Sequence, residues 1–556
     1  MTEQLQLVRH ITFIPASTNQ FNKLPTETIT NIFLFACLSP RPHHPHRIDP
    51  EYPLPELALS AVCHQWRDIF LKTPYLWTQL QVVFPFGIND KEVEGVMCWL
   101  KRTKGNDGAP DWPLDIHITA DRYSRRRFWK GENAADILPP LVGSLNRWRD
   151  FLFVQPIETI IYLLGYMETR VGWFSEMKLL ETFDLVVTDN FRFYNVVPDR
   201  AYVVFPHTGM KALKRMGFAS TAYPTNILDY FELPTSAPCL TTIKLTNVTS
   251  LDQEGLGWVR GLLLRYPTLE EAWFEEVYHL HPPNPALHLS LGDLDGGSDS
   301  VPNLKHLFLQ VEAFGFDVAL VNLKLPKLER LSLKALFTNP SIPTTTDLFD
   351  GILLRLQENS RFPLKSLTLH DINVSVDYLD QFLRGVNGTL EALSLPDCHK
   401  FQFAELVDRL NYGYPDMRSL LPKETEFWLP SPMPVLPRLS KLLMVGSSSI
   451  PGEIDGVVTF VLRRACTEGW TSNSVWDRVV PLRNARIQFN GLALSFEQML
   501  NLMEITTMQK NEEIEFKYPL PPIDDPFVLT LGKDAMNICL RDCRCDNCLR
   551  LTYSEA

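Results

Sequence analysis

The chain has 556 residues, 45% of them hydrophobic, and a formal net charge of −12 at pH 7. A chain of this length exceeds one compact core, which predicts several domains or one elongated array of repeats. The acidic balance argues against a nucleic acid as the main partner, because a phosphate backbone carries charge of the same sign.

Three features of the sequence concern its compartment. The N-terminal segment lacks the charged start and the long apolar centre of a signal peptide. No apolar run approaches the length that spans a bilayer. Of the ten cysteines, six are scattered singly, which is typical of a reducing interior. We therefore expect a soluble protein of the cytoplasm, the nucleus or both, without a membrane partner.

The stretch from Leu24 to Leu80 contains two helical signals separated by a proline-rich loop. Pro25 fits a first helical position, and one apolar face follows it at Ile29, Ile32, Phe33 and Ala36. A second helix is predicted to close at Lys72-Thr73-Pro74, with apolar positions at Leu59, Val62, Cys63, Trp66, Ile69 and Phe70.

This stretch resembles an F-box of the form seen in a large group of fungal proteins. The matching residues are Leu24, Pro25, Glu27, Ile32, Phe33, Val62, Cys63, Trp66 and Arg67, with the closing run Thr73-Pro74-Tyr75-Leu76-Trp77. The resemblance implies docking on a Skp-type adaptor through exposed apolar groups, expected at Leu24, Pro25, Ile32, Phe33 and Trp77. Trp66 is expected to pack within the helical hairpin. The alternative is an ordinary helical hairpin with a tryptophan in its core.

Beyond this stretch the sequence predicts a helix and then strands. The helix should bury Val93, Val96, Met97 and Leu100 on one face. The next run alternates apolar and polar residues, which predicts a strand with Leu114, Ile116 and Ile118 on one side. The segment from Arg147 to Val154 is interpreted as the next helix–strand step.

From about residue 170 the chain repeats a unit of the form P-x-L-x-x-L-x-L. The first leucines of its copies lie at 180, 213, 240, 269, 304, 328, 364, 390 and 439, mostly 24 to 36 residues apart. Alternation within each unit predicts a strand, and the intervening segments have helical periodicity.

One strand and one helix per repeat resembles a leucine-rich repeat. The asparagine or cysteine of that pattern is nearly absent, with Cys398 the best match, so irregular repeats are expected. We expect an α/β fold in which an F-box helical module is followed by an irregular leucine-rich-repeat solenoid, or horseshoe. The alternative is an α/β domain with a conventional parallel sheet.

The predicted domains are an N-terminal extension (1–20), the F-box (21–82), connecting helices with the first irregular repeats (83–170), irregular leucine-rich repeats (171–515) and a C-terminal tail with a cysteine cluster (516–556). Within the repeats, a shared core is expected at Leu304, Leu307, Leu309, Leu328, Leu331 and Leu333. Phe308 and Ser332 lie between strand leucines, so they are the candidates for contact with a target.

No catalytic arrangement with a specific spacing occurs in the sequence, so neither an enzyme nor a cofactor is expected. Cys539, Cys543, Cys545 and Cys548 match the four thiolates of a zinc site in number. Reduced, unliganded thiols are the favoured interpretation, because closing four ligands within one short turn would strain the backbone. The histidines at 43, 44 and 46 lack an evident fourth ligand.

An F-box followed by a repeat array resembles the substrate-recognition subunit of a cullin–RING ubiquitin ligase of the SCF type. By resemblance, the F-box would bind a Skp-type adaptor and through it a cullin, and the repeats would hold a target protein. The alternative is a leucine-rich-repeat scaffold that acts outside any ubiquitin ligase.

Overall fold

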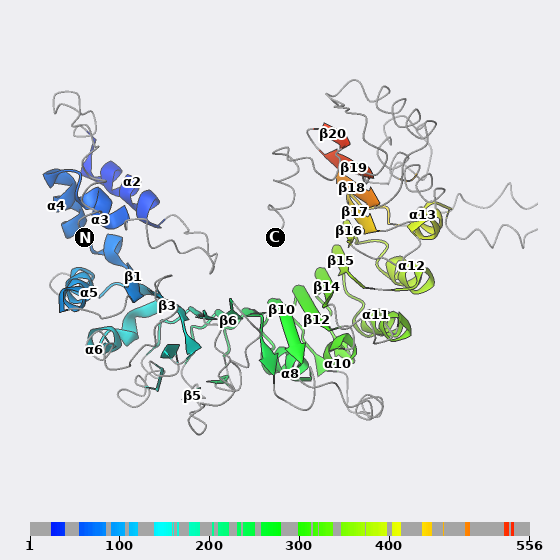
Figure 1. Cartoon of the computed structure of the whole chain (residues 1–556), viewed down its shortest axis with the longest axis horizontal. Helices are drawn as coiled ribbons and strands as arrows, with labels where there is room; N and C mark the ends of the chain where they lie inside the picture. Colours follow the sequence, from blue (N-terminus) through cyan, green and yellow to red (C-terminus); the bar gives the residue numbers. More distant parts are fainter. Residues whose placement is uncertain are drawn as a thin grey trace, which may run out of the picture. The chain divides into compact units, whose positions relative to one another are not determined.

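The computed structural model describes residues 24–38, 55–84, 90–105, 111–120, 138–157, 159–160, 164–165, 177–188, 203–204, 210–221, 231–234, 237–250, 257–279, 299–312, 315–320, 322–336, 346–372, 374–396, 403–412, 436–446, 460, 484–489, 527–532 and 535–538. The fold is mixed α/β with a large parallel sheet (Figure 1). The chain forms two compact units, Met1–Leu213 and Lys214–Ala556, here called unit 1 and unit 2.

Unit 1 begins with a helical module and continues with parallel strands. The module comprises α2 (Thr26–Leu38), α3 (Pro55–Ser60), α4 (His64–Lys72) and the 3₁₀ helix η4 (Pro74–Trp77). It is followed by β1 (Gln79–Phe84), α5 (Asp90–Arg102), β2 (Leu114–Ala120), α6 (Leu138–Val142), the 3₁₀ helix η7 (Leu145–Arg147), β3 (Trp148–Gln155), β4 (Thr182–Val187) and β5 (Val203–Val204). Strands β1 to β4 pair in that order, each parallel to the next.

The second predicted helix is two helices, because the chain turns between Ser60 and His64. Cys63 is extended, with φ −156° and ψ 170°, and its sulfur accepts a hydrogen bond from the Trp66 amide. It therefore caps the N-terminus of α4, whereas the sequence placed it inside one continuous helix. The break leaves Val62 57% exposed, so its predicted place on the apolar face is wrong.

The predicted helix and strands after the module are confirmed, with one correction in α5. Val96 is buried on that helix and Met97 is exposed; Trp99 and Leu100 complete the buried face. In β2, the alternating side chains of Leu114, Ile116 and Ile118 are fully buried.

Unit 2 adds one strand at a time to a sheet. Its strands are β6 (Arg215–Ser220), β7 (Phe231–Glu232), β8 (Thr242–Thr246), β9 (Thr249–Ser250), β10 (Glu271–His279), β11 (Asp299–Ser300), β12 (His306–Glu312), β13 (Leu323–Lys324), β14 (Arg330–Leu336), β15 (Ser366–His370), β16 (Ala392–Leu395), β17 (Lys441–Gly446), β18 (Asn484–Phe489), β19 (Phe527–Gly532) and β20 (Ala535–Ile538). The order β6-β8-β10-β12-β14-β15-β16-β17-β18 is parallel throughout. Strands β19 and β20 then pair antiparallel, within the segment predicted to be a tail.

The helices of unit 2 lie on one side of this sheet, as Figure 1 shows. They are α8 (Gly257–Arg265), α10 (Gly315–Leu320), α11 (Thr346–Ser360), α12 (Val376–Gly385) and α13 (Phe403–Tyr412). The opposite face of the strands, here called the open face, carries no helix within the described residues. Parallel sheets are usually covered on both faces, so the open face is an exception among the described elements.

The repeat register predicted from the sequence is confirmed. The first leucine of every copy is fully buried, and a strand begins two residues after it each time. Leu307, Leu309, Leu331 and Leu333 are buried, whereas Phe308 and its neighbour in register Ser332 are partly exposed. Alternate side chains of a strand point to opposite faces, so the leucines fill the core beneath the helices.

A repeated backbone contact fixes this register from strand to strand. The Lys214 carbonyl accepts hydrogen bonds from the amides of Thr241 and Thr242, and the Thr241 carbonyl accepts from Glu270 and Glu271. The same pattern continues along the sheet. Two amides at the start of the next strand donate to each of the carbonyls of Glu270, Lys305, Glu329, Lys365 and Glu391. The amides at the start of each strand are thereby hydrogen-bonded to a carbonyl of the preceding repeat.

Turn carbonyls are satisfied less regularly. Asn247 has a positive φ of 55°, and its side-chain amide donates to the Ser220 carbonyl at 3.2 Å. This is the type of contact for which the sequence offered only Cys398, a residue outside the described part of the chain.

Tyr266 gives a pH-dependent prediction for unit 2. It is buried beside α8 and donates its hydroxyl to the Pro234 carbonyl at 2.6 Å, and burial raises the pKa of Tyr266 to about 12. Because the pKa of the unfolded phenol is near its ordinary value of 10.0, the stability gained by burying the neutral phenol is present below pH 10 and is lost as the pH rises to 12. The loss should reach about 2–3 kcal/mol.

Thermal unfolding followed by circular dichroism across this pH range measures the effect. Tyr266→Phe has no hydroxyl to ionise, so it should lose less stability than the wild type over the same interval. Equal losses in the two proteins would contradict the assignment.

Candidate protein-binding surfaces

The core of the N-terminal module is a continuous stack of aromatic rings. Phe33 stacks on Phe70 with centroids 4.6 Å apart and meets Trp66 edge-on at 4.9 Å. Phe70 meets Trp77 at 6.0 Å, and Trp77 meets Trp99 of α5 at 4.8 Å. The stack therefore crosses from the module into the first helix after it.

Hydrogen bonds fix the two tryptophans at the centre of this stack. The Trp77 Nε1–H donates to the Phe70 carbonyl at 2.7 Å, and the Trp99 Nε1–H donates to the Trp77 carbonyl at 2.5 Å. The Arg102 guanidinium, at the end of α5, lies 4.4 Å from the Trp77 ring centroid. Both indole N–H groups are thus satisfied inside the core.

Two of the residues expected to contact an adaptor are interior. Phe33 and Trp77 are 0% and 1% exposed, so the expectation that they lie at the surface is wrong. On α2 the buried positions are Ile29, Phe33 and Cys37, at successive steps of four residues. This spacing turns Phe33 toward α4.

The opposite side of α2 is also apolar, and it is exposed. Ile32 is 42% exposed and Phe35 is 80% exposed. Ile32 was expected at the surface, whereas Phe35 was missed because the sequence shows only that α2 is apolar on more than one side. Of the two remaining candidates, Pro25 is exposed and Leu24 is half-buried.

The module as a whole concentrates exposed apolar side chains. Ten large apolar residues are exposed in the described chain, and five lie between residues 26 and 72: Ile32, Phe35, Leu57, Val62 and Leu71. Such a concentration on one small helical module is typical of an interaction surface.

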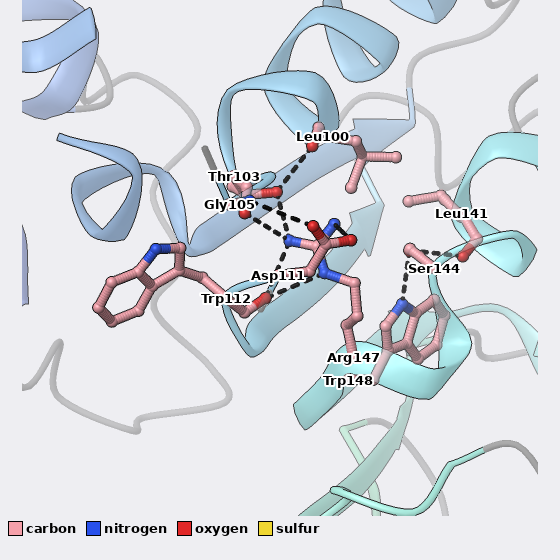
Figure 2. Close-up of polar contacts among 9 residues, drawn as sticks. All are labelled: Leu100, Thr103, Gly105, Asp111, Trp112, Leu141, Ser144, Arg147 and Trp148. Carbon is pink, nitrogen blue, oxygen red and sulfur yellow. Dashed lines mark hydrogen bonds and ion pairs between the residues drawn. The ribbon is translucent and has the colours of Figure 1, made fainter. Parts of the chain in front are cut away.

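Behind the module, a buried arginine ties α5 to the strands of unit 1 (Figure 2). The Arg147 guanidinium donates to the Thr103 carbonyl at 3.0 Å and to the Thr103 hydroxyl at 2.6 Å. Its Nε and Nη2 donate to the Trp112 carbonyl at 3.0 and 2.9 Å. Burial lowers the pKa of Arg147, and Asp111, 3.7 Å away, opposes that shift. The Arg147 guanidinium therefore connects η7 with the end of α5 and with the segment just before β2.

A second chain of contacts supports the same corner. The Trp148 Nε1–H donates to the Ser144 hydroxyl at 3.0 Å, and that hydroxyl donates to the Leu141 carbonyl at 2.7 Å (Figure 2). The corner is therefore held by side chains from η7 and β3 that reach back to earlier elements. Its role is structural, because the Arg147 guanidinium and the Trp148 indole N–H donate to groups of the same chain.

On the open face of unit 2, the most exposed aromatic group is Trp273. It is 39% exposed and stacks on Phe308 of the next strand, with centroids 5.1 Å apart and an interplanar angle of 22°. Ser332 follows Phe308 in register. The structure thus brings both target-contact candidates into one row with Trp273, which the sequence did not single out.

Charged groups surround this row. Glu271 and His306 are neighbours in register, and Glu271 Oε1 lies 3.0 Å from His306 Nδ1. At the start of the strands, Lys305 pairs with Glu270 at 2.8 Å and Lys365 pairs with Glu329 at 2.9 Å. The hydrogen bond from Lys365 lowers the pKa of Glu329, and the bond to Glu270 raises that of Lys305.

The proposed metal candidates Cys539, Cys543, Cys545 and Cys548 lie outside the described residues. Within the described part of the chain, no group of three or more His, Cys, Asp or Glu side chains is placed to hold a metal ion. The helices described there also include none that is long and apolar enough to span a bilayer.

Comparison with known proteins gave no assignment: no protein-family model matches this chain, and no curated protein matches it.

Proposed function

We propose that this chain is the substrate receptor of a cullin–RING ubiquitin ligase, in which the N-terminal module is an F-box. The observation that carries the proposal is the exposed apolar side of α2, with Ile32 and Phe35, on a module that carries the F-box-like residues of the sequence. A Skp-type adaptor would cover this side of α2. Leu24 and Pro25 lie just ahead of it and belong to the same expected contact.

The energetic argument is that a folded module with a complete core of its own still exposes large apolar side chains. Phe33, Phe70 and Trp77 fill that core, so Ile32 and Phe35 are not needed for it. Burying side chains of this size contributes roughly 1.5–3 kcal/mol each. A few such anchors dominate the affinity of an interface.

Unit 2 would then act as an irregular leucine-rich-repeat array that holds the target. Support comes from the buried leucines in constant register and from helices on one side of the strands. The receptor would perform no chemistry. It would raise the local concentration of target lysines near the charged ubiquitin-conjugating enzyme.

The test of this proposal is capture of the adaptor by the full chain. Replacing Ile32 and Phe35 together by Asp should lower adaptor capture by about tenfold or more, because two anchors become charged at an apolar interface. Met97→Asp is the matched control, since Met97 is 51% exposed on α5, outside the module. It should capture adaptor at the wild-type level.

Undiminished capture by the Ile32/Phe35 variant would refute the F-box assignment of this surface. Capture of a cullin together with the adaptor separates the ligase from a repeat scaffold acting outside it. An adaptor complex that never contains a cullin would favour the scaffold.

A further inference from the structure

A set of basic side chains lies on the open face of unit 2, on the strands after the aromatic pair. Arg330 and Lys334 alternate with the buried leucines of β14, and Lys441 precedes the buried Leu442 of β17. Because alternate residues of a strand face opposite sides, these cations point away from the helices. Arg330 and Lys441 are exposed, and Lys334 is half-buried.

These cations are not neutralised on the face itself. Arg330, Lys334 and Lys441 form no ion pair with any residue that the structure describes, unlike Lys305 and Lys365 at the start of the strands. The open-face positions of β14 to β17 contain no Asp or Glu within the described residues. In a chain of net charge −12, the open-face positions of β14 to β17, with unpaired cations and without a carboxylate, are complementary to an acidic partner.

The aromatic pair lies next to this basic region in the same row of the sheet. From Trp273 the row continues in register through Phe308, Ser332 and Thr368. Neighbouring strands lie about 4.8 Å apart, so these three steps span roughly 14 Å. An extended peptide covers that distance with about four residues. One short segment can therefore contact both the aromatic pair and the cations of β14.

We propose that this part of the open face binds a carboxylate-rich segment of a protein. One apolar side chain of the segment packs on Trp273 and Phe308, and its Asp or Glu side chains pair with Arg330 and Lys334. The small side chains of Ser332 and Thr368 leave room for the segment between them. That the bound protein is a target for ubiquitination rests on the proposed function.

A nucleic acid fits this face less well, although it is also anionic. Glu271 and Glu275 lie on β10, on either side of Trp273 in the sequence, so a phosphate chain stacked on the aromatic pair would meet two carboxylates. A peptide places an uncharged residue there and its carboxylates further along. The order of an apolar anchor followed by acidic residues is thus the specific feature of the proposed ligand.

The experiment uses the full chain and a labelled peptide in which one tryptophan precedes a run of glutamates. The comparison peptides replace the glutamates by glutamines or by phosphoserines, and binding is followed by fluorescence anisotropy at low and high salt. The glutamate peptide should bind at least about tenfold more tightly than the glutamine peptide, and its affinity should fall as salt is added.

Charge reversal of Arg330 and Lys334 to Glu should lower this affinity by about tenfold or more. The matched control reverses Lys327 and Arg438, which are exposed in the turns before β14 and β17, and should change it by less than about twofold. Trp273→Ala should weaken both the glutamate and the glutamine peptide. If the reversed protein fails to fold, Arg330→Gln with Lys334→Gln gives the same test.

Equal binding of the glutamate and glutamine peptides would overturn the inference, and so would binding of the phosphorylated peptide alone. Equal losses in the Arg330/Lys334 variant and its control would also overturn it. Adaptor capture by the same proteins is a separate readout. Its absence in the wild type refutes the proposed function, whereas the peptide data alone decide this inference.

Discussion

Replacing Trp77 by Ala is expected to destabilise the N-terminal module by about 3–5 kcal/mol. Trp77 is 1% exposed and contacts Phe70 on one side and Trp99 on the other. Its removal leaves a cavity between the module and α5, and the Phe70 carbonyl loses the indole N–H that donates to it at 2.7 Å. Two costs therefore add: the lost apolar burial and the loss of one hydrogen bond to the Phe70 carbonyl, which retains its bond from the Thr73 amide.

Hydrogen exchange of the full chain measures this effect locally. The amides of α2, α4 and α5 should lose protection, because the stack joins all three helices. Trp66→Ala is the matched control: Trp66 is half-buried, whereas Trp77 is fully buried, so its effect should be smaller. A Trp66 variant that loses more protection than the Trp77 variant would contradict this account.

Replacing Arg147 by Ala should cost roughly 3–5 kcal/mol, because a charged donor is removed from buried acceptors. The Thr103 hydroxyl and the Trp112 carbonyl lose their bonds to the guanidinium, at 2.6 and 2.9 Å (Figure 2). Exchange should increase at the end of α5 and in β2 and β3. These are the elements that the guanidinium joins.

Two further variants define the cause. Arg147→Lys keeps the charge but presents one nitrogen in place of the planar fork, so it should restore only part of the protection. Arg67→Ala removes an arginine whose bond to the Ser60 carbonyl is exposed, and it should have little effect. Full rescue by lysine would mean that the fork geometry is not required.

The repeat architecture could be derived from the sequence because its signal is local. Each strand alternates Leu with polar residues, as in Leu331 and Leu333, and one face of such a strand must be buried. A shift by one residue would expose every leucine, so the register has one stable solution. The buried first leucines and the partial exposure of Phe308 and Ser332 followed directly from this pattern.

The helical module was harder to derive, because its helices are apolar on more than one side. The composition of α2 does not distinguish Phe33, which contacts Phe70, from Phe35, which is 80% exposed. Only the position of α4 decides between them. The interruption of the helix at Cys63 was missed for a related reason. The Cys63 thiol serves as a helix cap only when the backbone before α4 is extended.

The sequence by itself therefore determined the strands of the repeated unit, their register and the leucine core, since these depend on a period of two residues within each segment. The tertiary structure alone decided which apolar side chains remain exposed and which polar groups hold the corners. Arg147 contacts Thr103, a residue 44 positions away, and Trp273 meets Phe308 only because β10 and β12 pair. Such contacts depend on the packing of distant elements, for which no local period exists.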